Sequence, residues 1–130
     1  MLPRLHLVIG LLALVIFLFT GQLMQHLYLV PGMENTARAI YRSGHLYIFY
    51  AAVINIVIGL YYRPQGRIHI LAWFNSALIL VSPVLLIAGF FTETKLAQIE
   101  RSSAYFGAVF IFIALVNILL GRCWLWFKQR

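Results

Sequence analysis

The sequence predicts an all-α membrane protein, a bundle of four transmembrane helices built from one integral membrane domain over residues 1–130. Hydrophobic residues make up 63% of the chain and charged residues 10%, and the mean hydropathy of +0.92 lies outside the range of soluble domains. Four apolar windows, at about residues 5–30, 44–62, 68–91 and 103–121, are each long enough to cross a hydrocarbon core of ~30 Å. A repeated asparagine motif in the second and fourth windows indicates how the helices are paired.

The first span begins near Leu5 and is apolar, apart from His6, for most of its length. Its outer half then carries Gln22, Gln25 and His26, whose i, i+3, i+4 spacing puts them on one face of a helix. Lipid offers an amide no hydrogen-bond partner, so we expect this face to point into the bundle. No AxA-like cleavage site follows the apolar run, and we therefore expect the span to be retained rather than removed as a signal peptide.

A proline-glycine pair at residues 31–32 ends the first helix. The next residues, 33–43, carry Glu34, Arg38 and Arg42 at four-residue spacing, which predicts a short separate helix on the outer membrane surface. The second span follows this surface helix, beginning near residue 44.

The third span contains a proline and a polar stripe. Asn75, Ser82 and Gly89 follow one another at heptad spacing, so they share a face. Pro83 has no backbone N–H, so it should kink the helix and leave the carbonyl oxygen of Ile79 without its helical donor. We expect the Ser82 hydroxyl to take that donor's place.

The pattern AxxNxxxG occurs twice, at Ala52–Gly59 and Ala114–Gly121. In each copy the alanine, asparagine and glycine fall within an arc of ~60° on a helix. The copies predict a tandem repeat of two like-oriented helical hairpins. We expect Asn55 and Asn117 to hydrogen-bond to each other where the hairpins meet. The predicted polar core of the bundle comprises Gln22, Gln25, Asn55, Asn75, Ser82 and Asn117.

The net charge of +7 is concentrated at the ends of the spans and not along one helix face, which argues against nucleic-acid binding. Short loops rich in Lys and Arg stay in the cytoplasm, and a cytoplasmic N-terminus places 6 bases and no acids inside against 4 bases and 3 acids outside. We therefore predict a multi-pass protein of the inner membrane with both termini cytoplasmic. The six inside bases are Arg4, Arg63, Arg67, Arg122, Lys128 and Arg130.

Charged residues near the outer ends of the spans form a predicted rim. It is either an ordinary solvated surface or a site for an anionic lipid headgroup or small solute. No carboxylate lies within a span, which argues against a proton- or sodium-coupled carrier, and no catalytic motif occurs. We therefore predict a non-enzymatic protein that binds a lipid or solute or serves a membrane complex, including one with further copies of itself. The rim residues are Arg38, Arg42, Glu93, Glu100 and Arg101.

Histidines support an alternative function. His26 and His45 lie at similar depth near the outer ends of two spans, where they could hold a b-type haem from both sides or, with nearby glutamates such as Glu34, bind a transition metal. His6 and His69 lie at the inner ends of their spans, beside arginines, and we expect both to anchor the helices at the interface.

Overall fold

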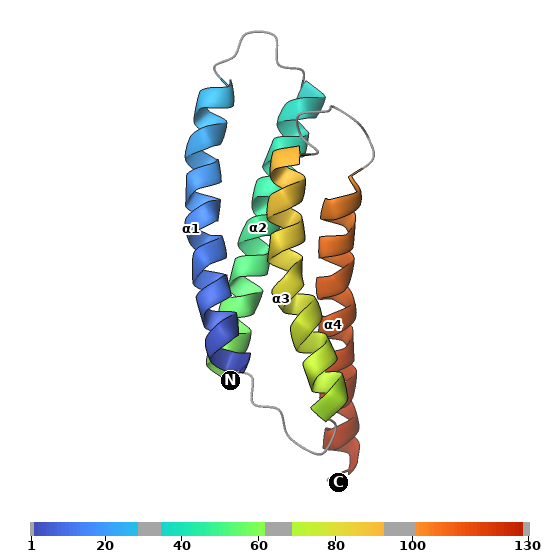
Figure 1. Cartoon of the computed structure of the whole chain (residues 1–130). Coiled ribbons are helices and arrows are strands. Elements are labelled where there is room, and N and C mark those ends of the chain that lie inside the picture. The colour runs from blue at the N-terminus through green and yellow to red at the C-terminus, as the bar shows by residue number, and fades with distance from the viewer. Residues whose placement is uncertain (1, 29–34, 62–68, 93–100, 129–130) are drawn as a thin grey trace.

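A computed structural model describes residues 2–28, 35–61, 69–92 and 101–128. These residues form four helices, α1 (Leu2–Tyr28), α2 (Asn35–Tyr61), α3 (His69–Thr92) and α4 (Ser102–Lys128). Each helix contains a stretch long and apolar enough to cross a membrane, so the predicted all-helical class with four candidate spans is confirmed. Figure 1 shows the helices side by side. We call the end where α1 begins and α4 ends the proximal end, and the opposite end the distal end.

The first turns of α2 differ from the prediction. Residues 35–43 do not form a separate surface helix, because α2 runs without interruption from Asn35 to Tyr61. Gly44, where the break was expected, is buried, and a Cβ atom placed on it would lie 3.3 Å from Phe90 Cδ2. Packing against α3 thus keeps the backbone helical through a glycine that would be a weak point in isolation.

A stripe of small and polar residues turns α1 toward the bundle. His6, Gly10, Ala13, Thr20 and Met24 are all buried, at spacings of three, four and seven residues that keep them on one face of the helix. Seven large apolar side chains of α1, between Leu5 and Phe19, lie on its other faces and are exposed. Small residues on the inner face let the neighbouring helix approach closely.

The expectation that Gln22, Gln25 and His26 point into the bundle is wrong, because all three are exposed. At ~100° per residue their shared face lies ~160° around α1 from the stripe that contains Thr20 and Met24. The sequence pattern correctly groups the three residues on one face, but close packing of the glycine and alanine on the opposite face decides which way α1 is turned. Gln22 and Gln25 are therefore not part of the polar core.

The backbones of α1 and α2 touch at two glycines, one from each helix. A Cβ atom on Gly10 would lie 2.8 Å from Ile56 N and 2.9 Å from Ala52 O. A Cβ atom on Gly59 would lie 2.8 Å from Leu7 N. Since real Cβ atoms do not approach backbone this closely, only glycine fits at either position. α1 packs chiefly against α2 and α3 chiefly against α4, while α2 also packs against α3.

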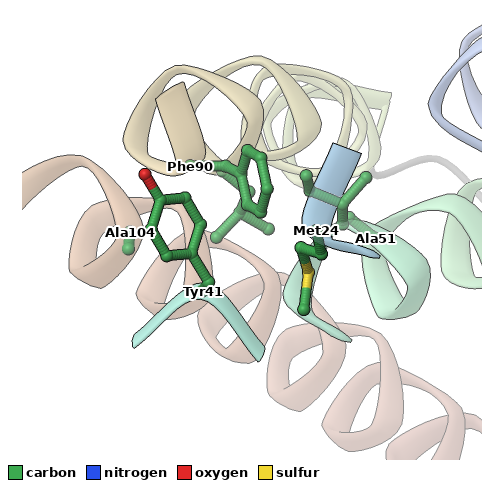
Figure 2. Close-up of a cluster of buried hydrophobic side chains, with 7 residues drawn as sticks. Met24, Tyr41, Ala51, Phe90 and Ala104 are labelled. Atoms are coloured by element: carbon green, nitrogen blue, oxygen red, sulfur yellow. The ribbon is translucent and has the colours of Figure 1, made fainter. Parts of the chain in front are cut away.

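The apolar core at the distal half draws on all four helices (Figure 2). The rings of Tyr41 and Phe90 meet edge to face, with centroids 5.5 Å apart. A smaller apolar cluster of Ile58, Ile79 and Ala114 joins α2, α3 and α4. The distal cluster comprises Met24, Tyr41, Ile48, Ala51, Leu86, Phe90 and Ala104.

Candidate functional site

A buried polar cluster joins α1, α2 and α3 toward the proximal end. His6 is 1% exposed and Asn55 is fully covered, so their polar atoms depend on one another for hydrogen bonds. His6 Nδ1 lies 2.8 Å from Asn55 Oδ1, and His6 Nε2 lies 2.5 Å from Ser76 Oγ. One imidazole from α1 thus connects a carboxamide on α2 with a hydroxyl on α3.

The hydrogen-bond directions in this cluster follow from the Asn55 carboxamide. Its Nδ2 donates to Ala51 O at 2.9 Å and to Ile79 O at 3.1 Å, which leaves Oδ1 to accept from His6. His6 Nδ1 therefore carries the hydrogen, and Nε2 accepts from the Ser76 hydroxyl. A neutral imidazole in this tautomer satisfies every group that it contacts.

The carbonyl oxygen that Pro83 leaves free in α3 has two donors. Ser82 Oγ donates to Ile79 O at 3.0 Å, as predicted, and Asn55 Nδ2 donates to the same oxygen from α2. The helix direction changes about halfway along α3 (Figure 1). The missing helical bond is thus replaced by one local bond and one bond between helices.

Asn55 and Asn117 do not hydrogen-bond to each other, so the predicted bond between them is wrong. Asn117 Nδ2 instead donates to Asn75 Oδ1 on α3 at 3.2 Å. The reason is the way the helices pack. α4 lies chiefly against α3, and the Asn55 carboxamide already bonds to His6 and to the carbonyl oxygen of Ile79.

His6 was predicted to be an interfacial anchor, but it is buried in the polar cluster. Its position four residues before Gly10, on the face that packs closely, is the signal that could have revealed it. His69 begins α3, so the structure places it at the proximal end of that helix.

His45, in the distal half of the bundle, is held against α1. Thr20 Oγ1 donates to Phe17 O at 2.9 Å, so it accepts from His45 Nδ1, which lies 3.0 Å away. The imidazole also stacks on the Phe17 ring, with centroids 4.1 Å apart. Gly21 leaves room for the ring, since a Cβ atom there would lie 3.2 Å from His45 Cε1.

The structure does not bring His26 and His45 together. His26 is exposed on α1, whereas His45 contacts the buried face of the same helix. Among the described residues no three His, Cys, Asp or Glu side chains gather as a metal site, and Glu34, Glu93 and Glu100 lie outside those residues. His26 and His45 therefore do not face one another as a pair of axial haem ligands within one chain.

Arg101 connects the start of α4 to α2 at the distal end. Its Nη1 donates to Ser43 Oγ at 2.8 Å, and that hydroxyl donates to Ile40 O at 2.9 Å. The guanidinium lies over Gly44, where a Cβ atom would be 3.4 Å from Nη2. The arginine and the glycine thus allow these two helices to meet at the rim.

Within the described part of the chain, three guanidinium nitrogens at this end are buried without a hydrogen-bond partner: Arg38 Nε, Arg101 Nε and Arg101 Nη2. Arg42, one turn beyond Arg38 on α2, is exposed. The three glutamates of the chain all lie outside the described ranges, so those ranges contain no carboxylate side chain. The structure thus gathers the three predicted rim arginines at the distal end, where α2 and α4 begin.

Comparisons with models of known protein families, with curated proteins and with solved structures found no match.

Proposed function

We propose that this chain is a non-enzymatic, multi-pass membrane protein that binds an anionic, oxygen-rich group at its distal rim. The observation that carries the proposal is the set of three buried guanidinium nitrogens that have no hydrogen-bond partner among the described residues. A guanidinium stays charged at all physiological pH values and costs free energy when it is shielded from water without a partner. A phosphate or carboxylate oxygen is the acceptor that such nitrogens bind best.

The position of the rim supports the same conclusion. The first turns of α2 and α4 lie at this end, so both helix dipoles add positive potential beside Arg38 and Arg101. The Ser43 hydroxyl fixes one edge of the Arg101 guanidinium and leaves its other edge to a ligand. A ligand oxygen reaches that edge when the arginine side chain turns from its contact with Gly44. The ligand is either the phosphate of a lipid headgroup or a small soluble anion.

We also propose how the bundle is oriented in the membrane and that it arose from a tandem repeat. The excess of Lys and Arg at the proximal end supports cytoplasmic termini in an inner membrane, so that the distal rim faces outward. The matching positions of Asn55 and Asn117 support two like-oriented hairpins derived from a tandem repeat. Membership of a larger membrane complex is compatible with the same rim, because a partner can supply the anion.

Native mass spectrometry of the protein in dodecylmaltoside micelles tests the proposal. Phosphatidylglycerol and phosphatidylcholine are added at equal concentrations, and inorganic phosphate serves as the soluble probe in a separate thermal-melting series. If the ligand is a lipid, the protein should retain phosphatidylglycerol selectively. If the ligand is a soluble anion, inorganic phosphate alone should stabilise the protein. Losing one charged hydrogen-bond donor in Arg38→Gln or Arg101→Gln should weaken the selected probe about tenfold.

Lys128→Gln provides the matched control, because it removes one exposed positive charge at the proximal end. It should leave binding unchanged. Equal retention of the two lipids together with no effect of phosphate would contradict the proposed function. A similar loss in the Lys128 variant would show that overall charge, and not the rim, attracts the anion.

A further inference from the structure

α4 carries a seam of residues that the bundle leaves largely uncovered. Its members follow one another at spacings of three and four residues, the pattern by which two helices pack along a shared seam. Phe106, Ile113 and Trp124 are 51%, 40% and 70% exposed, and all three lie within the candidate membrane span of α4. The α4 seam comprises Phe106, Phe110, Ile113, Asn117, Gly121 and Trp124.

No neighbouring residue of the described chain packs against the glycine in this seam. Gly121 has no atom within 4 Å of the position of an added Cβ. Gly59 occupies the same place in the other copy of AxxNxxxG, and there a Cβ atom would lie 2.8 Å from Leu7 N of the helix that covers it. The glycine of the motif is thus closely packed in α2 and open in α4.

The hydrogen bond between Asn117 in the seam and Asn75 on α3 leaves one acceptor open on Asn117 and one donor open on Asn75. Asn117 Nδ2 donates to Asn75 Oδ1, and within the described residues neither Asn117 Oδ1 nor Asn75 Nδ2 has a hydrogen-bond partner. Asn75 is only 4% exposed. In the described part of the chain, the fully buried side-chain atoms without a hydrogen-bond partner all belong to Arg38 and Arg101, so Asn75 Nδ2 is not fully buried. The remaining exposure of Asn75 therefore includes that nitrogen. An open amide at this depth needs a partner, because hydrocarbon supplies none.

We propose that the α4 seam is the docking site for a second copy of this chain. An unpaired donor on Asn75 of α3 and an unpaired acceptor on Asn117 of α4, in two side chains bonded to each other, form a self-complementary pair, which is what a twofold contact between identical surfaces requires. Asn75 Nδ2 of each copy donates to the Asn117 oxygen of the other, and the bare Gly121 lets the two α4 helices approach as α1 approaches α2 at Gly59. Both copies insert with the same topology, so the dimer is parallel.

Cysteine cross-linking in membranes tests the geometry. In a Cys123→Ser background, which removes the native cysteine, Ile113→Cys should form a disulfide-linked dimer on oxidation. Phe112→Cys is the matched control, since it is the adjacent residue, is 69% exposed and lies ~100° around the helix, outside the α4 seam. Equal cross-linking at the two positions, or none at position 113, would overturn the proposal.

The association itself is measured by light scattering in mild detergent over a dilution series. Gly121→Leu should weaken the dimer about tenfold or more, and it has room within one copy, so the bundle remains folded by circular dichroism. Asn117→Leu should weaken it as well, by removing the open acceptor. A monomeric wild-type protein at all concentrations, or a dimer unaffected by Gly121→Leu, would refute the inference. Neither result bears on anion binding at the distal rim, where separate residues act.

Discussion

The pair His6 and Asn55 should be energetically coupled, and a double-mutant cycle can measure the coupling. Asn55→Leu removes two bonds between helices, to His6 and to Ile79, and it leaves the His6 Nδ1 hydrogen buried without an acceptor. The Ile79 oxygen retains its bond from Ser82. His6→Leu likewise leaves Asn55 Oδ1 without a donor and removes the bond to Ser76.

The expected magnitudes follow from these losses. Hydrogen bonds between membrane helices contribute ~0.6 kcal/mol on average and up to ~1.7 kcal/mol each, and an orphaned buried group adds ~1–3 kcal/mol. Each single variant loses two such bonds and orphans a buried group, so Asn55→Leu and His6→Leu should each destabilise the fold by about 2–6 kcal/mol. In the double variant both partners are gone and neither is orphaned, so its cost should fall short of the sum by about 1–3 kcal/mol.

Reversible unfolding by sodium dodecyl sulfate in mixed micelles, followed by tryptophan fluorescence, gives the four free energies of unfolding. Gln22→Leu is the control for replacing a polar residue on the exposed face, and it should change the free energy by less than ~0.5 kcal/mol. Single-variant effects that add to within ~0.5 kcal/mol would show that the two side chains do not interact, and would refute the network as described.

Three further outcomes follow from the packing. Gly59→Ala should abolish or severely weaken folding, measured as the yield of folded protein, because its Cβ would overlap backbone. Gly121→Ala should leave that yield unchanged, and equal yields of Gly59→Ala and wild type would contradict the close contact. Ser82→Ala should lower the free energy of unfolding by at most ~1 kcal/mol, since Ile79 O still accepts from Asn55 Nδ2. A larger loss would show that the bond from Asn55 is weak. Gln25→Leu should leave thermal stability in detergent within ~1 °C of wild type, and a marked change would mean that the residue faces the bundle after all.

The local sequence was sufficient to predict the helices and some of their internal bonds. Apolar length and the short polar connections predict four membrane-length helices because hydrocarbon leaves the backbone no other way to satisfy its polar groups. The bond from Ser82 to Ile79 O was also predictable, because Pro83 frees that oxygen within the same helix turn. The three rim arginines lie next to helix ends, and the helix order alone brings those ends together.

The partners of the polar side chains were decided by tertiary packing. A helical period groups residues on a face, but it does not say which face turns inward, and the glutamines of α1 therefore looked buried when they are exposed. The repeated motif likewise identified two special asparagines without identifying what each contacts. Close approach at Gly10 and Gly59 rotates α1 so that His6 meets Asn55, and α4 lies against α3 so that Asn117 meets Asn75. Side-chain hydrogen bonds reach only ~3 Å, so their choice of partner depends on rotations and distances between helices that no single stretch of sequence contains.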